Sequence, residues 1–365
     1  MGAGGGKPCN DGLTAQKSEQ KSDMNFISDN QAGAHPAVLA AISDAASGLA
    51  EGYGEDSLTA AAESAVREVF ETDCAVFFVT TGTAANALAM SALCPPWGAI
   101  YCHEGAHIQN DENTAVELYT GGARMVGIAG DGGKPDILVM RSHMEIATVH
   151  GVHNAKPGAI SLSNVTESGT VYRPEEVAGY RQLADEFQLN LHMDGARFAN
   201  SVVASGVSPA DVTWRAGIDC LSFGLTKNGG IATEAVVMFN SALAEDFAYR
   251  RKRTGHLWSK QRFLAAQWLA LLENDLWLDN ARHANAMARE LAAGFAAHDA
   301  IRLPWPVDAN ELFPVIPEML RRQLRESGLA FYDWPQEAGM TRFVTNFGTD
   351  PAEVARALEV IAASQ

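Results

Sequence analysis

A lysine at position 227 follows a short apolar run. Residues 221–225 are predicted to form a buried strand, and the Asn-Gly-Gly sequence at 228–230 predicts a turn that lets the backbone approach a ligand closely. Lys227 at such a strand end would be partly desolvated, would lose proton affinity, and could form a Schiff base with a carbonyl cofactor. The alternative is a surface lysine in a loop, because lysines are rarely buried.

A second apolar stretch, residues 189–198, ends in the polar residues His192, Asp194 and Arg197. Ligands of α/β sheets bind where strands end, so these side chains and Lys227 are expected to share one crevice. Asp194 could pair with a pyridinium nitrogen, and Arg197 could hold a phenolate oxygen or a carboxylate. This set of groups predicts pyridoxal 5'-phosphate as the cofactor. A local ion pair between Asp194 and Arg197 is the alternative.

A glycine-containing segment between a strand and a helix predicts a phosphate site. Residues 75–79 form the expected strand, and an Ala- and Leu-rich helix is expected to run to about residue 93. Between them, Gly82 permits close backbone approach, Thr83 offers a hydroxyl, and the free N–H groups of the helix start attract an anion. A tight turn without a ligand is the alternative, but Lys227 downstream favours phosphate.

The segment 103–112 is the most polar cluster next to a predicted core strand. His103, His107 and Asp111 are residue types that bind zinc, but no further group completes a ligand set, so we predict no metal. A packed or solvated histidine is the alternative to a functional one at position 107.

Six short motifs follow one another in a defined order: Phe-Ile-Ser-Asp-Asn at 26–30, Ala-Glu-Gly-Tyr-Gly-Glu-Asp at 50–56, Thr-Gly-Thr-Ala-Ala-Asn at 81–86, His-Met-Asp-Gly-Ala-Arg at 192–197, Ser-Phe-Gly-Leu-Thr-Lys-Asn-Gly at 222–229 and Thr-Arg-Phe at 341–343. Together they resemble the L-threonine aldolase family of fold-type-I pyridoxal-phosphate enzymes. The resemblance covers nearly everything from Phe26 to the C-terminus. Each motif alone is weak, but their order and spacing are specific.

The resemblance implies that Ser28 and Arg342 bind the substrate carboxylate, Arg342 through a two-pronged contact that a lysine cannot reproduce. The loop around Tyr53 would lie near the cofactor, often across a subunit interface. Lys252 and Lys260 belong to a dense basic segment that the family brings to the phosphate of the neighbouring subunit. From the residues alone, Ser28 is equally an ordinary turn or cap, Arg342 a strand-edge charge, and the basic segment a solvated helix face.

The resemblance also bears on the base that removes the substrate hydroxyl proton. It places His107 over the face of the cofactor ring and Asp111 near the substrate side chain. The family commonly has a histidine where this chain has Glu167, so the chain departs from the pattern there. His153, in the preceding loop, is a candidate to supply the imidazole, as in a subgroup of these aldolases. The base is therefore open among His107, His153 and Glu167.

Strand and helix patterns alternate along most of the chain and predict a parallel or mostly parallel sheet with helices on both faces. This is the α/β class, and the resemblance implies the fold-type-I, aspartate aminotransferase-like version of it. We expect a disordered leader over 1–24, a large cofactor-binding domain over 25–270, and a small C-terminal α+β domain over 271–365. Residues 268–298 are expected to form one long connecting helix, and 311–313 and 342–347 are expected to form strands.

The formal net charge of −17 and the pI near 5.0 argue against nucleic acid or an anionic membrane as the main partner. The five cysteines include no Cys-x-x-Cys pair and are expected to be reduced thiols. Since no apolar run reaches roughly 18 residues, we expect neither a membrane span nor a signal peptide, and a cytoplasmic protein. The resemblance implies a homodimer or homotetramer with active sites at the subunit interface.

The predicted reaction is retro-aldol cleavage of an L-3-hydroxy-α-amino acid, such as threonine, allo-threonine or phenylserine, to glycine and an aldehyde. A β-eliminating lyase or an aminotransferase of the same fold is the nearest alternative, because these enzymes differ in which substrate bond they orient for cleavage. A non-catalytic cofactor-binding regulator is the alternative from another class, although the chain has no DNA-binding segment or basic domain. The preferred substrate and its stereochemistry at the β-carbon stay open.

Overall fold

The computed structural model describes residues 24–364. Its centre is a seven-stranded sheet in the order β2-β8-β7-β6-β5-β3-β4. β8 runs antiparallel to both of its neighbours, and the other pairs are parallel, so the predicted mostly parallel sheet is confirmed. The strands are β2 (Ala75–Val79), β3 (Gly98–His103), β4 (Arg124–Ile128), β5 (Lys156–Ser163), β6 (Asn190–Gly195), β7 (Cys220–Gly224) and β8 (Glu234–Met238).

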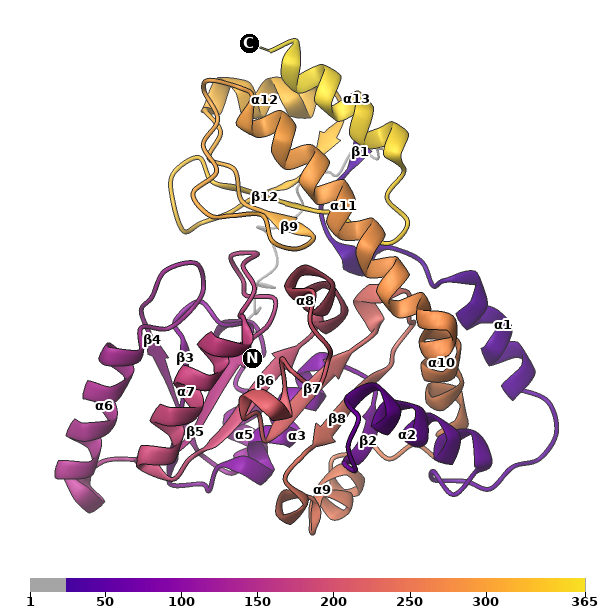
Figure 1. Cartoon of the computed structure of the whole chain (residues 1–365), viewed down its shortest axis with the longest axis vertical. Helices are drawn as coiled ribbons and strands as arrows, with labels where there is room; N and C mark the ends of the chain where they lie inside the picture. Colours follow the sequence, from indigo (N-terminus) through magenta and orange to yellow (C-terminus); the bar gives the residue numbers. More distant parts are fainter. Residues whose placement is uncertain (1–23, 365) are drawn as a thin grey trace, which may run out of the picture.

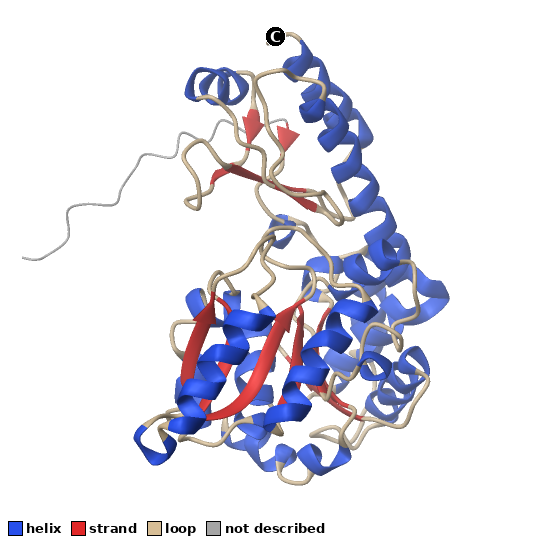
Figure 2. Cartoon of the chain, turned by 60° about the vertical axis from the view of Figure 1, so that its left-hand side comes forward, coloured by secondary structure: helices blue, strands red, loops and turns tan. Residues whose placement is uncertain are grey.

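Helices cover both faces of this sheet, as Figure 2 shows. One face is packed by α1 (Pro36–Ala45), α2 (Ser57–Phe70), α6 (Ile137–Val149), α7 (Pro174–Phe187), α8 (Phe198–Ser205) and α10 (Arg262–Leu272). The opposite face is packed by α3 (Gly82–Leu93), α4 (His107–Asn110), α5 (Ala115–Thr120) and α9 (Phe247–Arg253). Since a strand alternates its side chains, Val237 of β8 enters the first core and Val236 the second. Both faces of β8 therefore pack into apolar cores.

An aromatic cluster holds the strand that leads to Lys227. Phe223 of β7 is fully buried and contacts Trp268 edge-on, with ring centroids 4.8 Å apart. Phe198 and Phe70 also meet the Phe223 ring edge-on, at 5.1 and 5.7 Å. Burying one such ring stabilises the fold by about 1.5–3 kcal/mol, and each aromatic pair adds about 0.5–1.5 kcal/mol. The end of β7 is therefore rigidly placed.

The expected single helix over 268–298 is wrong at its start. α10 ends at Leu272, and α11 (Leu276–Ala296) begins after a short turn. Asn274 and Asp275 both have left-handed backbone, with φ of 51° and 57°, which a continuous right-handed helix does not allow. α11 then extends from the large sheet to the C-terminal part of the chain (Figure 1).

The C-terminal part has its own core around Leu291, Phe331 and Phe343. Its three-stranded sheet has the order β11-β12-β9, and a separate parallel pair joins β1 to β10. Its further elements are β1 (Met24–Asn25), β9 (Glu311–Leu312), α12 (Glu318–Glu326), β10 (Leu329–Ala330), β11 (Tyr332–Asp333), β12 (Thr341–Val344) and α13 (Pro351–Ala362). The first described strand thus belongs to the C-terminal layer. The division predicted at residue 270 falls within α10.

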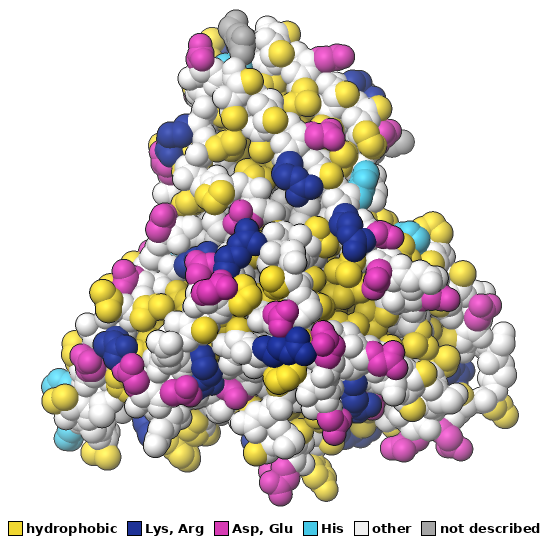
Figure 3. All heavy atoms as spheres, in the orientation of Figure 1, with side chains coloured by type: hydrophobic (Ala, Val, Ile, Leu, Met, Phe, Trp, Pro, Cys, Tyr) yellow, Lys and Arg dark blue, Asp and Glu magenta, His cyan; other side chains and the backbone are white. Residues whose placement is uncertain are grey.

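The predicted leader 1–24 lies, apart from Met24, outside the described residues. Within 24–364, the four cysteines, Cys74, Cys94, Cys102 and Cys220, are buried and free. No helix among the described residues is long and apolar enough to cross a membrane. Basic and acidic side chains are interspersed over the face drawn in Figure 3.

Candidate active site

The carboxyl ends of β5, β6 and β7 bring several predicted residues to one edge of the sheet. Asp194 pairs in register with Ser163 on one side and with Ser222 on the other. Lys227 lies in the 3-10 turn Thr226–Asn228 that directly follows β7. Gly229 closes this turn with φ of 105°, and a Cβ there would lie 3.1 Å from both Asn280 and His35. A glycine is therefore required for the turn that presents the lysine.

Asp194 is buried, with 6% of its surface exposed. Its Oδ2 accepts a hydrogen bond from Asn86 Nδ2 at 2.8 Å, and its Oδ1 accepts one from the Ala196 N–H at 3.0 Å. Both contacts fix the orientation of the Asp194 carboxyl group. The preceding His192 bridges the hydroxyls of Ser161 and Ser222, each 2.9 Å away, and burial lowers the pKa of its imidazole to about 4. His192 is therefore a neutral packing residue beneath the site.

The start of α3 is open as the phosphate prediction requires. Thr81 Oγ1 caps the helix by accepting the Ala84 N–H at 3.1 Å. A Cβ built on Gly82 would meet nothing within 4 Å, so the backbone there is accessible to a ligand. Thr83 lies in the first turn, where helix N–H groups have no partner within the helix. His256 lies beside this turn, with Nδ1 3.4 Å from Thr80 Oγ1.

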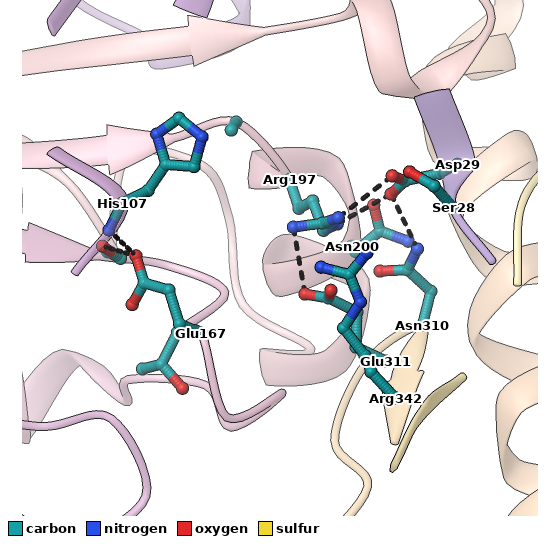
Figure 4. A network of polar contacts seen from close by, with 12 residues as sticks. Ser28, Asp29, His107, Glu167, Arg197, Asn200, Asn310, Glu311 and Arg342 are labelled. Carbon is teal, nitrogen blue, oxygen red and sulfur yellow. Dashed lines mark hydrogen bonds and ion pairs between the residues drawn. The ribbon is translucent and has the colours of Figure 1, made fainter. Parts of the chain in front are cut away.

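The Glu167 side chain contacts the backbone of His107 directly (Figure 4). The Glu167 Oε1 atom accepts the His107 backbone N–H and the Ser163 hydroxyl, each at 2.8 Å. Burial raises the pKa of Glu167 to about 7, although these two hydrogen bonds oppose the rise. Glu167, where the family commonly has histidine, can therefore titrate near neutrality as an imidazole does.

The His107 ring contacts Glu112, which was not among the predicted site residues. Its Nδ1 lies 2.9 Å from Oε1 of Glu112, whose side chain is 1% exposed. The neighbouring Asp111, which was expected near the substrate, is exposed at the end of α4 and donates its backbone N–H to the His107 carbonyl. Asp111 and Glu112 both carry a carboxyl group, so the sequence did not indicate which of them is buried beside His107.

His153 lies at the opposite end of the sheet. It belongs to the 3-10 turn Gly151–His153, which precedes the first residue of β5, whereas Asp194 pairs with the last. An eight-residue strand spans about 25 Å. The exposed His153 is therefore not brought to Lys227 of the same chain, and within one chain His107 and Glu167 are the two candidate bases.

Arg197 does not form the local ion pair with Asp194, so that alternative is wrong. Its Nε and Nη2 atoms bond both carboxylate oxygens of Asp29, at 2.7 and 3.0 Å, and its Nη1 lies 3.0 Å from Glu311 Oε2. Burial opposes the charge of Arg197, but the two carboxylates outweigh it and raise its pKa. Burial also opposes the charge of Asp29 and so raises its pKa, but the charges of Arg197 and Lys227 lower this pKa below its ordinary value. This buried network is drawn in Figure 4.

Arg342 lies beside the same network. Its guanidinium packs over the rings of Trp334 and Tyr332, at 4.9 and 5.3 Å from their centroids, and its Nη2 donates to the Ile27 carbonyl at 3.2 Å. Ser28 follows directly and caps the 3-10 turn Asp29–Gln31 by accepting the Asn30 N–H at 3.1 Å. Arg342 thus contacts the residue next to Ser28, although 314 positions separate Ser28 and Arg342 in the sequence.

Tyr53, Lys252 and Lys260 lie together on the outside of the chain. All three are exposed, and the Lys252 ammonium stands 4.2 Å above the centre of the Tyr53 ring. The Tyr53 N–H donates to the Ser259 carbonyl at 3.0 Å, so the Tyr53 loop and the basic segment form one surface. None of the three contacts the Lys227 turn in the described part of the chain.

A further buried carboxyl lies behind Lys227. Glu234, the first residue of β8, is 6% exposed and pairs in register with Gly224 and Val79. Burial raises its pKa to about 7, while hydrogen bonding to Thr226 and the charge of Lys227 oppose the rise. Glu234 could have been identified from the sequence, because it is a carboxyl residue at the start of an otherwise apolar strand.

The site residues fit pyridoxal phosphate on the chemistry of their donor groups. Lys227 offers an amine for the aldehyde, Asp194 a buried carboxylate for the ring nitrogen, and the start of α3 free N–H groups for the phosphate. No group of three or more His, Cys, Asp or Glu residues suited to a metal occurs within 24–364. The arrangement is that of a carbonyl-cofactor site.

Comparisons with known proteins agree with this geometry. The family model of beta-eliminating lyases matches residues 25–318. Low-specificity L-threonine aldolases from Pseudomonas sp. (strain NCIMB 10558) and Pseudomonas aeruginosa are 43% identical over 91% and 90% of this chain, and over 95% and 94% of their own lengths. A threonine aldolase structure from Leishmania major aligns with a TM-score of 0.87 and 30% identity, covering 93% of this chain and 99% of that one.

An aspartate aminotransferase from Rhodobacter sphaeroides aligns with a TM-score of 0.68 over 93% of this chain and 91% of its own, at 15% identity. That likeness shows the fold alone. The family model and the Pseudomonas and Leishmania relatives go further, because they extend over most of the chain. The chain therefore belongs to the beta-eliminating lyase family of fold-type-I pyridoxal-phosphate enzymes, together with the low-specificity L-threonine aldolases.

Proposed function

We propose that this protein cleaves L-3-hydroxy-α-amino acids to glycine and an aldehyde, with threonine, allo-threonine and phenylserine as the substrate class. The convergence of Lys227, Asp194 and the start of α3 at one sheet edge carries this proposal. The names of the Pseudomonas relatives specify the reaction within the family. When bound, pyridoxal phosphate supplies an electron sink for the broken bond.

Each protein group then has a defined task. Lys227 would hold the cofactor through its side-chain amine. Asp194 keeps a positive charge on the far ring nitrogen, and Asn86 and the Ala196 N–H hold its carboxylate in place. Gly82 and Thr83 bind the phosphate at the start of α3.

The substrate carboxylate is bound by Ser28 and Arg342. Trp334 and Tyr332 fix the plane of the Arg342 guanidinium, so its donors are oriented before the substrate arrives. Arg197 supports this site indirectly, because Asp29 and Glu311 already neutralise it. Fixing the carboxylate orients the Cα–Cβ bond for cleavage, and that orientation distinguishes an aldolase from an aminotransferase.

His107 or Glu167 removes the proton of the β-hydroxyl. The two residues are in direct contact, and the Glu167 carboxyl with a pKa of about 7 is suited to exchange protons at neutral pH. Asp111 is proposed to lie near the substrate side chain. His153 would have to act from another subunit, because it lies at the far end of β5 in its own chain.

We further propose a homodimer or homotetramer in the cytoplasm, with sites at the subunit interface. The surface formed by Tyr53, Lys252 and Lys260 would face the phosphate of the neighbouring subunit. Its exposed aromatic ring and ammonium groups support this role, because they lie away from Lys227 of their own chain.

The test is incubation of the holoenzyme with L-threonine, L-allo-threonine and L-phenylserine, followed by measurement of acetaldehyde or benzaldehyde together with glycine. The expected products are the aldehyde and glycine, and Lys227→Ala should release almost none. Lys156→Ala, an exposed lysine at the opposite end of β5, is the matched control and should react normally.

Formation of a keto acid or of ammonia in place of aldehyde would identify an aminotransferase or a β-eliminating lyase. Cofactor binding without any product would identify a non-catalytic protein. Either result would refute the proposed function.

A further inference from the structure

A buried carboxylate, Glu112, connects the ring of His107 to the interior of the protein. The Glu112 Oε1 atom lies 2.9 Å from His107 Nδ1 and accepts a hydrogen bond from Asn86 Nδ2 at 2.8 Å. The Glu112 side chain is 1% exposed, whereas 46% of the His107 side chain is exposed. The imidazole is therefore partly exposed, while its Nδ1 atom contacts a buried carboxylate.

Asn86 extends this connection to the carboxylate proposed for the cofactor nitrogen. Its Nδ2 group donates to Glu112 Oε1 and to Asp194 Oδ2, both at 2.8 Å. Asn86 is 2% exposed and lies one turn into α3, so its position is fixed by a packed helix. A continuous chain of hydrogen bonds thus runs from His107 through Glu112 and Asn86 to Asp194.

The charges around His107 act in different directions. The hydrogen bond to Glu112 is the largest influence and raises the pKa of His107, and Asp194 adds to the rise, whereas burial and Lys227 oppose it. For Glu112, burial raises the pKa above its ordinary value, while His107 and Asn86 favour the ionised form and Asp194 disfavours it. Glu167 faces the same turn through its bond to the His107 N–H. The one carboxylate in direct contact with the ring is Glu112, among the residues that the structure describes.

We propose that Glu112 is a positioning residue that keeps the proton of neutral His107 on Nδ1 and turns the Nε2 lone pair toward the substrate. The inference rests on the proposed function for its meaning, since the Nε2 atom would exchange the proton of the substrate hydroxyl. A carboxylate accepts hydrogen bonds only, so Nδ1 must be the donor in this contact. The other ring nitrogen is then the acceptor.

The direct test is the protonation state of His107 in the intact protein, with and without pyridoxal phosphate. Histidine labelled with ¹⁵N in the ring reports which nitrogen carries the proton, and His107→Phe identifies the signal among the ten histidines. Wild-type protein should show Nδ1–H. Glu112→Leu, which leaves Nδ1 without its acceptor, should move the proton toward Nε2, and Glu112→Gln, which removes the negative charge, should lower the pKa of His107. Glu104→Gln, an exposed carboxylate in the turn that precedes α4, is the matched control and should change neither.

Kinetics give a second readout. Glu112→Gln should reduce kcat on the order of 10²-fold, with little change in KM, and should shift the limb of the pH–rate profile that reports His107 toward lower pH.

An Nε2–H tautomer in the wild type, an unchanged tautomer in Glu112→Leu, or an unchanged pKa of His107 in Glu112→Gln would overturn the inference. Because the wild-type measurement needs no variant, it decides even if Glu112→Gln does not fold. Failure of aldehyde release with an Nδ1–H tautomer present would refute the proposed function and leave the assignment of Glu112 intact.

Discussion

Glu167→Gln is expected to change how the free energy of unfolding depends on pH, by an amount that follows from the pKa of Glu167. Glutamine keeps the shape of the side chain, and its Oε1 can still accept the His107 N–H and the Ser163 hydroxyl. Only the titratable proton is lost. Since burial raises the pKa of Glu167 from 4.5 to about 7, the folded state binds this proton more tightly than the unfolded chain does.

The sign of the effect follows from proton linkage. Below pH 4.5 the Glu167 carboxyl is protonated in the folded and the unfolded protein, so it does not reduce the free energy of unfolding. Between pH 4.5 and about 7 the unfolded chain ionises first, so the wild type loses stability as the pH rises. Above pH 7 the full cost is about 3 kcal/mol, at 1.36 kcal/mol for each pH unit. Glutamine carries no such cost, so the variant should be the more stable protein at pH 8 and nearly equal at pH 4.5.

Urea unfolding of the two proteins at pH 5 and pH 8 measures this difference. Glu145→Gln, an exposed carboxylate on α6, controls for the change of net charge. A difference between wild type and Glu167→Gln that stays constant with pH would refute the reasoning. The same variant separates the two candidate bases, because kcat should fall about 10²- to 10⁴-fold if Glu167 removes the hydroxyl proton.

Three further substitutions have expected outcomes. Asp194→Asn should lower kcat on the order of 10²-fold without loss of folded protein, because an amide cannot hold the positive ring nitrogen; kcat and circular dichroism together check this. Arg342→Lys should raise KM about tenfold to a hundredfold with a smaller change in kcat, since a lysine cannot form the two-pronged contact, and a substrate titration measures it. Arg197→Met should reduce the free energy of unfolding by about 3–5 kcal/mol, because Asp29 and Glu311 would be left buried without a countercharge; a smaller loss, measured by urea unfolding, would show that water reaches these carboxylates.

Much of the architecture could be predicted because apolar runs and polar strand ends are local signals. The run before Lys227 and the polar end at Asp194 placed both residues at the same sheet edge, as the register of β6 and β7 shows. The break between α10 and α11 was missed, although Asn274 and Asp275 are residue types that favour helix ends and tolerate left-handed backbone.

The side-chain network could not be predicted, because it joins distant parts of the chain. Arg197 bonds Asp29, which lies 168 positions earlier, and Glu311. No local pattern relates these residues. Asp111 and Glu112 differ in burial alone, so the sequence did not identify the carboxylate that holds His107.

The first described strand has a mechanical consequence. The Phe26 N–H donates to the Ala330 carbonyl, and the Phe26 carbonyl accepts the Val344 N–H. The segment that contains Ser28 is therefore hydrogen-bonded to the same layer as Arg342. The two residues proposed to bind the substrate carboxylate thus belong to the same layer of the protein. If this layer moved relative to the large sheet about the break at Asn274, Ser28 and Arg342 would move together. The hydrogen bonds between Asp29 and Arg197 would oppose such a movement.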